Sequence, residues 1–218
     1  MMNEMMAYTG ALASVWIVVG IYIASRFYPN YSHRTQFCSE LGAFGSPTQK
    51  LSPLINNYPL GLLFILFGVY VATQFQNDVP HLVIGIVISV HGLATWVTGY
   101  FPMDKDPYTQ GPSSSCKIHS LAGVFMLLSL IIAPGIIVFH SDYSMGFRLF
   151  SAACLAGCFY FSFKLGIAFK DKTVPGIYQR LSYGAQILWL FSYSILLAFD
   201  YIPLNLPPSI TRFAPVIN

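Results

Sequence analysis

The sequence predicts an all-α polytopic membrane protein that folds as a bundle of six transmembrane helices. Of its 218 residues, 55% are hydrophobic and 9% are charged, whereas about a quarter of the residues in soluble domains are charged. Six apolar stretches of about twenty residues are each long enough to cross a bilayer core at roughly 1.5 Å per helical residue. The stretches are continuous rather than alternating, which indicates helices and not the strands of a membrane barrel.

The six predicted spans follow one another closely, so little of the chain is left for a second domain. We therefore expect residues 1–218 to form one integral membrane domain. The first span starts without basic residues and has no small-residue cleavage site after it, so we interpret it as a permanent span. The proline-rich segment after Tyr201 is expected to lie along the outer surface. The predicted spans are residues 6–27, 58–75, 79–101, 119–139, 147–169 and 181–201.

The connections between spans are short on one side of the membrane and long on the other. Nine of the eleven Lys and Arg residues fall on the side of the long connections, and only Arg148 and Arg212 fall on the opposite side. By the positive-inside rule, the side with long connections is cytoplasmic and both termini face outward. We expect the protein in the cytoplasmic (inner) membrane of a prokaryote. The connections at 76–78 and 140–146 define the short-loop end, and those at 28–57, 102–118 and 170–180 define the long-loop end.

The basic residues indicate membrane lipids as partners and exclude nucleic acid. They are spread along one membrane boundary, where anionic headgroups attract them, and they form no basic run. Small residues recur at four-residue spacing in the fifth span, as Ala152 with Ala156, which would let another helix approach closely. That helix belongs to the bundle itself, to a second copy in a homo-oligomer, or to a membrane partner protein.

Polar residues from several segments meet at the long-loop end and form the candidate site. Glu40, Asp104 and His119 are the candidate catalytic residues, because carboxylates with a histidine can act as general base and acid. The same residue types can hold a divalent cation, but they lack the compact spacing of a zinc signature, so we predict no metal and leave the cofactor open. A structural alternative is that the acids cap helices or form turns. The candidate substrate-binding residues are Arg180 and Lys117, which suit a phosphate, and Asn57, Tyr183 and Ser39.

The other histidines have simpler interpretations. His91 lies deep in the third span, and we expect it to be neutral and bonded to a helix neighbour such as Thr95. It is not level with His119, so the two make a poor axial pair for a haem. His81 and His140 lie near the outer boundary, where we expect them to be solvated or to cap helices.

Four short motifs at the ends of the spans resemble those of a known family. In their order and position they are similar to the family known as "domain of unknown function 998", and more distantly to six-span proteins that include autophagy-modulator and glycolipid-anchor-remodelling members. The resemblance implies a six-span fold and a shared site at Glu40, Asp104, His119 and Arg180, but no established reaction. The typical last motif has Glu before the Arg, whereas this chain has Gln179. The motifs are Tyr31-Ser32-His33 leading to Ser39-Glu40-Leu41-Gly42-Ala43, Phe101-Pro102-x-Asp104, His119 opening a span, and Gly176-x-Tyr178-Gln179-Arg180.

The first class of function that fits these residues acts on lipids. The protein would bind or chemically modify the headgroup of a phospholipid or an isoprenoid lipid, in the second case as a membrane-embedded hydrolase or transferase. Glu40 or Asp104 would serve as the base, and His119 as the acid or as a ligand.

Two further classes stay open, a transporter for a small solute or proton and a non-catalytic scaffold or partner subunit. In the scaffold, the polar residues only tie loops together, for example through a salt bridge between Glu40 and Arg180. Transport needs polar groups within the bilayer. The deep candidates are His91, Thr95, Ser129, Tyr183 and Gln186.

Overall fold

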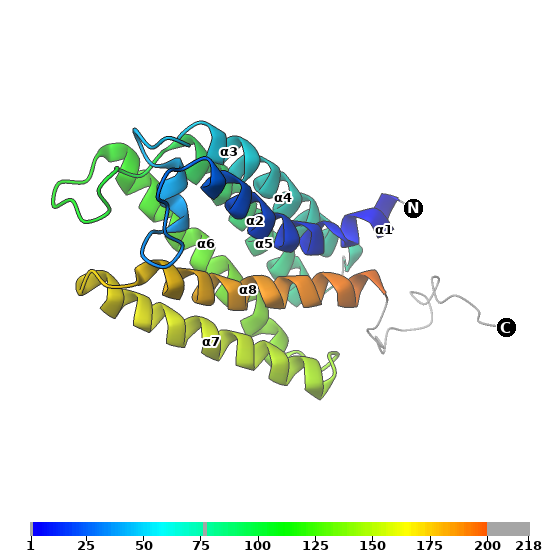
Figure 1. Cartoon of the computed structure of the whole chain (residues 1–218). Helices are drawn as coiled ribbons and strands as arrows, with labels where there is room; N and C mark the ends of the chain where they lie inside the picture. Colours follow the sequence, from blue (N-terminus) through cyan, green and yellow to red (C-terminus); the bar gives the residue numbers. More distant parts are fainter. Residues whose placement is uncertain (1, 76–77, 200–218) are drawn as a thin grey trace.

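The structure is a computed structural model that describes residues 2–75 and 78–199 (Figure 1). In these ranges every regular element is helical, and six helical segments are long and apolar enough to cross a membrane. The predicted all-α, six-helix bundle is therefore confirmed, and the chain is a multi-pass membrane protein. The elements are α1 (Met2–Ala7), α2 (Thr9–Arg26), the 3-10 helix η1 (Cys38–Gly42), α3 (Leu51–Ile55), α4 (Asn57–Gln74), α5 (Val79–Tyr100), α6 (Ser114–Phe139), α7 (Met145–Lys170) and α8 (Pro175–Ala198).

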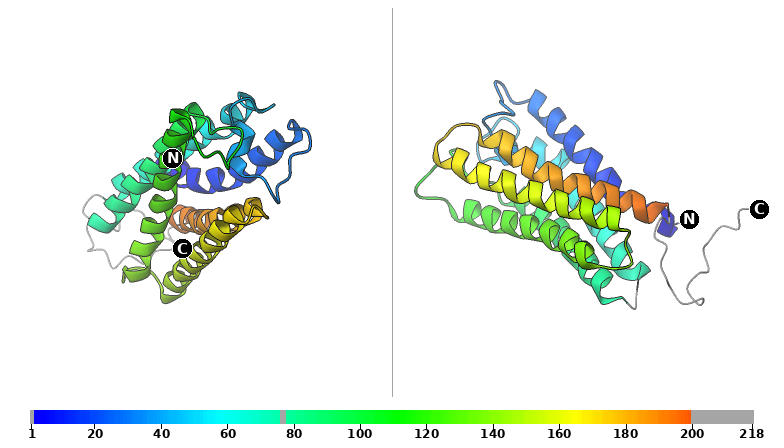
Figure 2. Two further views of the ribbon diagram at one scale, coloured as in Figure 1. Left: turned by 90° about the vertical axis from the view of Figure 1, so that its left-hand side faces the viewer. Right: turned by 90° about the horizontal axis from the view of Figure 1, so that it is seen from below.

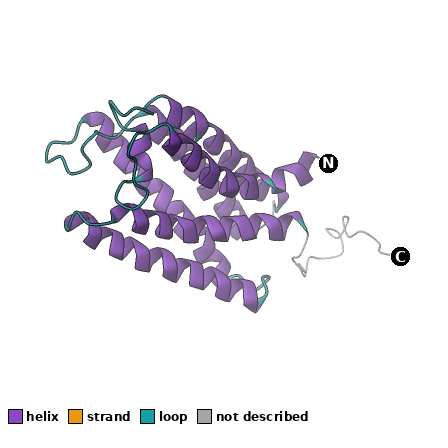
Figure 3. Cartoon of the chain, in the orientation of Figure 1, coloured by secondary structure: helices purple, strands orange, loops and turns teal. Residues whose placement is uncertain are grey.

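The long helices pack in a ring in which neighbours along the chain are also neighbours in space. From α4 to α8, each helix packs against the next, and α2 closes the ring by packing against both α8 and α4. Figures 1 and 2 show α2, α4 and α5 in one layer, α7 and α8 in another, and α6 crossing between them. The long loops gather at the end of the bundle that lies away from α1 (Figure 3).

Two helices begin earlier than hydropathy predicts, because their first turns are polar but are stabilised by a capping serine in α6 and by a proline at the first position in α8. The helix α6 begins at Ser114 and not at 119, since the side chain of Ser113 accepts a hydrogen bond from the backbone N–H of Cys116. The helix α8 begins at Pro175 and not at 181, with the proline in the first turn where it needs no hydrogen-bond acceptor. The predicted end of the last span at Tyr201 and the proline-rich segment after it lie outside the described residues.

The closest helix contact is built from glycines on α4 and α5. A Cβ atom on Gly92 would lie 2.5 Å from the carbonyl oxygen of Gly61, and one on Gly85 would lie 2.5 Å from that of Gly68. No real side chain fits at such distances, so these glycines let the two backbones touch. The small residues of the fifth span make a looser contact within the bundle, because a Cβ on Gly157 would meet the Cβ of Ala185 at 3.6 Å.

The middle of the bundle is a layer of buried apolar side chains. Hydrogen bonds of α8 lie at its edges: Ser194 Oγ accepts from the backbone N–H of Ala11 and donates to the carbonyl oxygen of Ala7, and Trp189 Nε1 donates to Ser151 Oγ. The layer separates the polar groups of the long-loop end from those of the short-loop end. Its fully buried side chains include Phe64, Phe67, Ile84, Ile88, Leu130, Trp189, Leu190 and Tyr193.

Candidate functional site

A cavity of about 900 Å³ lies at the long-loop end of the bundle, between α2, α4, α5, α6, α7 and α8. Its wall is largely apolar, and among the described residues that line it Arg180 is the one with a formal charge. Val18 and Tyr22 of α2 belong to the wall and are 66% and 59% exposed. The cavity is therefore open along α2, which forms part of one of the six segments long and apolar enough to cross a membrane. The predicted site residues that line it are Ser39, Asn57, His119, Arg180 and Tyr183.

His119 is held in a fixed orientation in this cavity. Its Nδ1 lies 2.8 Å from the carbonyl oxygen of Phe101 and 3.1 Å from that of Thr98, at the end of α5. Carbonyl oxygens only accept hydrogen bonds, so Nδ1 carries the proton of the neutral ring, as assigned from these contacts. The lone pair is then on Nε2, where it is free to accept a proton or a hydrogen bond.

Two asparagines at the start of α4 add amide groups to the cavity wall. The Asn57 Nδ2 group donates to the carbonyl oxygen of Thr95 at 3.2 Å and to Thr98 Oγ1 at 3.0 Å, which fixes the amide with its oxygen as an acceptor. The neighbouring Asn56 Oδ1 is buried without a hydrogen-bond partner among the described residues, and it occupies the space that a side chain on Gly20 of α2 would need. The α2–α4 contact thus depends on a glycine beside an unpaired amide oxygen.

His91 is linked to the cavity through Tyr183, which corrects the expectation that it bonds to a neighbour on its own helix. Its Nδ1 lies 3.0 Å from the carbonyl oxygen of Met126 and 2.9 Å from Ser129 Oγ, both on α6. Its Nε2 accepts from the Tyr183 hydroxyl on α8 at 2.9 Å. The Thr95 hydroxyl instead donates to the backbone carbonyl of His91. His91 therefore ties three helices together and fixes the phenol of Tyr183.

Arg180 holds a loop against α8. Its guanidinium donates to the carbonyl oxygens of His33, Gln36 and Gly176 at 2.7, 2.8 and 2.9 Å, and to the Tyr31 hydroxyl at 2.6 Å. Burial and the nearby positive charge of Arg180 lower the pKa of His33 below its usual value. The guanidinium thus positions the loop before η1.

Glu40 is likewise used for local structure. Its carboxylate accepts hydrogen bonds from the backbone N–H of Phe37 at 2.7 Å and from Gln36 Nε2 at 3.1 Å, and this caps η1. Among the described residues it forms no ion pair with Arg180, so the salt bridge considered for the scaffold is not present.

The candidate catalytic residues are not brought together. Glu40 lines a separate pocket of about 610 Å³, together with Lys105 and Lys172, whereas His119 lines the larger cavity. Asp104 accepts a hydrogen bond from the backbone N–H of Ser113 at 2.8 Å before α6, and this contact holds the pKa of its carboxyl below the usual range. Asp104 and Lys117 are not among the residues that line either pocket.

The family described as "Protein of unknown function (DUF998)" matches residues 11–196 of the chain. The chain belongs to this family. The match runs from α2 into α8 and includes all four motifs, so the predicted resemblance is confirmed. No curated protein and no solved structure matches the chain. The more distant similarity to autophagy-modulator and glycolipid-anchor-remodelling proteins stays a prediction.

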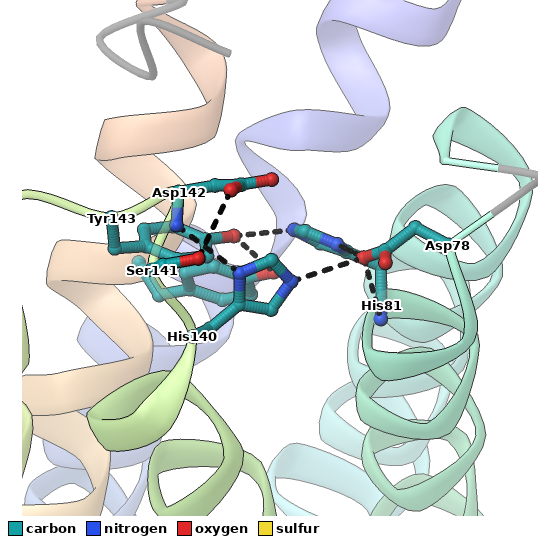
Figure 4. Close-up of polar contacts among 7 residues, drawn as sticks. Asp78, His81, His140, Ser141, Asp142 and Tyr143 are labelled. Atoms are coloured by element: carbon teal, nitrogen blue, oxygen red, sulfur yellow. Dashed lines mark hydrogen bonds and ion pairs between the residues drawn. The ribbon is translucent and has the colours of Figure 1, made fainter. Parts of the chain in front are cut away.

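This member of the family also carries a polar cluster that sequence reasoning missed, at the short-loop end. Asp78 precedes α5, His81 lies in the first turn of α5 and His140 follows α6 (Figure 4). Of the two roles expected for the outer histidines, solvation is wrong for His81, which is 1% exposed, whereas His140 occupies the C-cap position of α6. Partial burial alone would raise the pKa of Asp78, but hydrogen bonds from the two histidines hold it below its usual value. The Asp-x-x-His spacing at a helix start is the signal that could have revealed the pair.

Proposed function

We propose that the protein binds one amphipathic membrane lipid in the cavity, with the polar headgroup beside Asn57, His119 and Tyr183 and the chain along the apolar wall. The observation that carries the proposal is the shape and chemistry of the cavity. It is about 900 Å³, within the size range of ligand sites, it has a largely apolar wall, and it is open along α2. A ligand can therefore enter from the bilayer without crossing water.

The polar groups of the cavity favour a headgroup that donates hydrogen bonds. His119 Nε2, the Asn57 amide oxygen and the Tyr183 oxygen can all accept hydrogen bonds. The donor group of each residue is already engaged: His119 Nδ1 by carbonyl oxygens, the Asn57 amide nitrogen by a carbonyl and a hydroxyl, and the Tyr183 hydroxyl by His91. Arg180 adds positive charge, although its N–H groups are largely directed at carbonyl oxygens. An anionic phospholipid with a free hydroxyl in its headgroup, such as phosphatidylglycerol, suits this combination best.

His119 is the residue that would support a reaction on such a lipid. A ring whose Nδ1–H is fixed by carbonyl oxygens and whose Nε2 faces the cavity can take a proton from a hydroxyl, as a general base does. Glu40 and Asp104, the other candidate catalytic residues, are engaged in capping elsewhere. Binding is therefore the core of the proposal, and catalysis rests on His119 alone.

Filling the cavity tests the proposal. Gly123 of α6 lines the cavity, and a Cβ placed there meets no atom within 4 Å, so Gly123→Leu extends a side chain from a position with open space around it. Gly135 on the same helix is equally open but does not line the cavity, which makes Gly135→Leu a matched control. Native mass spectrometry in mild detergent is expected to show one retained lipid per chain for wild type and Gly135→Leu, and none for Gly123→Leu. Equal retention in all three proteins, or none in wild type, would contradict the proposal.

The lipid class is read from the same experiment. Phosphatidylglycerol, an isoprenoid alcohol and phosphatidylcholine are offered in equal amounts before detergent exchange. Phosphatidylglycerol supplies both the hydroxyl and the negative charge, the isoprenoid alcohol supplies only the hydroxyl, and phosphatidylcholine supplies neither a hydroxyl nor a net charge. We expect the order of retention to follow this series.

A further inference from the structure

Three potential metal ligands converge at the short-loop end (Figure 4), and none of them lines the cavity. One ligand atom from each of Asp78, His81 and His140 can be chosen so that all three lie within 4.8 Å of one another. Asp78 and His81 are fixed relative to each other by the start of α5, where the Asp78 carboxylate accepts the backbone N–H of His81. His140 arrives from the other side, at the end of α6.

We propose that Asp78, His81 and His140 bind a divalent transition-metal ion, with zinc as the ion that fits best. Two imidazoles and one carboxylate are a typical zinc ligand set, and three protein ligands leave a fourth position open. The ligands of a tetrahedral zinc ion lie about 3.3 Å apart, since each is roughly 2.0–2.1 Å from the metal. His140 Nε2 and Asp78 Oδ2 lie at this spacing, 3.3 Å apart, whereas His81 Nδ1 and Asp78 Oδ2 are in closer contact, so the partly exposed Asp78 carboxylate has to move away from His81 to admit the ion.

His81 lies between two oxygen groups. Its Nδ1 is in close contact with the Asp78 carboxylate, and its Nε2 lies 2.5 Å from the Tyr143 hydroxyl, which also contacts the Tyr193 hydroxyl at 3.3 Å. Without a metal ion, Nδ1 carries the proton of the neutral ring and donates it to the Asp78 carboxylate, which only accepts. A metal ion bound at Nδ1 takes the place of that proton, and Nε2–H then donates to the Tyr143 oxygen.

The surroundings of His81 match the outer shell of a metal site. A ligating histidine almost always donates its second N–H to an oxygen, which fixes the ring and raises its basicity, and the Tyr143 oxygen is placed to accept that bond. His81 and Tyr143 are both buried, so the ring cannot turn away.

Access to the cluster is from the end of the bundle. The Asp78 side chain is 37% exposed, so an ion can reach the cluster from water past this carboxylate, whereas the His140 side chain is 9% exposed. In the structure, His140 Nδ1 accepts a weak 3.4 Å hydrogen bond from the backbone N–H of Asp142. When Nε2 binds a metal ion, the proton of the ring lies on Nδ1 and this hydrogen bond is lost. Ser141 and Asp142 are exposed, so the turn can release this bond at little cost.

Zinc binding to the full-length protein in detergent, with any affinity tag removed, tests the proposal. Isothermal titration and metal analysis after dialysis are expected to give one zinc ion per chain. Asp78→Asn and His140→Ala should each weaken zinc binding about 100-fold or more, since even outer-shell changes cost about 10–100-fold. Asp142→Asn is the matched control, because Asp142 is an exposed neighbour outside the ligand set, and it should leave the affinity unchanged.

Two further measurements separate a metal site from a simple ion pair. Tyr143→Phe should weaken zinc binding roughly 10-fold, because it removes the oxygen that orients His81. X-ray absorption of the zinc-loaded protein should show nitrogen and oxygen ligands at about 2.0–2.1 Å. The proposal is overturned if wild type binds no stoichiometric zinc, or if Asp78→Asn and His140→Ala bind it as well as wild type does.

Discussion

The two ends of the bundle use their polar residues in different ways. At the long-loop end the charged side chains of Arg180 and Glu40 bind mainly backbone groups, and the groups that face the cavity are nearly all neutral. At the short-loop end, side chains bind one another, with Asp78 between two histidines. The distribution of charge along the chain therefore indicates where loops are anchored, and the two proposed ligand sites lie where polar groups have spare hydrogen-bonding capacity.

Arg180→Ala should give the largest effect on stability at the long-loop end. Three carbonyl oxygens and a phenol lose a charged donor, which should lower the free energy of unfolding by about 3 kcal/mol. Thermal unfolding in nanodiscs measures the loss. Arg34→Ala is the control. The Arg34 side chain is exposed, and the hydrogen bond that Arg34 makes to Ile177 comes from its backbone carbonyl, which the substitution keeps.

The same variant separates a positioning role from a headgroup role for Arg180. If Arg180→Ala left the unfolding temperature unchanged and abolished lipid retention, the guanidinium would be a headgroup ligand and its positioning role would be wrong.

Exchanging one histidine at each end should give two independent losses. His119→Gln removes one acceptor from the cavity and should weaken lipid binding about 10-fold, the equivalent of one hydrogen bond of about 1.4 kcal/mol. It should leave zinc binding unchanged. His140→Gln should have the reverse pattern. A loss of both ligands in either variant would show that the ends are coupled, against the separation by the apolar layer.

The pH dependence of stability should show a small contribution from His33. Its pKa is lowered in the folded protein, so below about pH 6.5 the unfolded state binds the proton more readily than the folded state does. Stability should therefore fall as the pH drops below about 6.5 and should not depend on His33 above it. His33→Gln should reduce the slope of unfolding temperature against pH between 7 and 5.5. An unchanged slope would contradict the lowered pKa.

The protein is expected to conduct no protons across a membrane. His91 reaches the cavity through Tyr183, but Ile84, Ile88 and Leu130 are fully buried between it and the short-loop end. Proteoliposomes should therefore leak protons no faster than empty liposomes. A flux that His91→Ala abolishes would favour the transporter.

Much of the fold follows from the sequence, because the apolar length of a span is a local property. The helix starts at Ser114 and Pro175 were missed, since hydropathy does not detect a polar first turn that is stabilised by a cap or by a proline. The structural interpretation of the acids was also predictable: Glu40 caps η1, and Asp104 contacts the turn before α6.

The sites depend on packing between segments distant in the chain, which one sequence does not specify. His119 meets carbonyls at the end of α5, and His140 meets Asp78 only because α6 packs against α5. Four of the five predicted binding residues and His119 line one cavity, but sequence reasoning also grouped Glu40 and Asp104 with His119 on the basis of membrane side alone. Sharing a side does not bring side chains into contact.

Photochemical labelling tests the central claim most directly. A phosphatidylglycerol with a photoreactive diazirine in its acyl chain is incorporated into liposomes with the protein, and the labelled residues are mapped by mass spectrometry. Adducts are expected on the cavity wall at Met126, Leu127 and Ile187, and they should disappear in Gly123→Leu but not in Gly135→Leu. Adducts confined to outward-facing residues such as Phe159 and Phe163, and equal in all three proteins, would contradict a lipid-binding cavity.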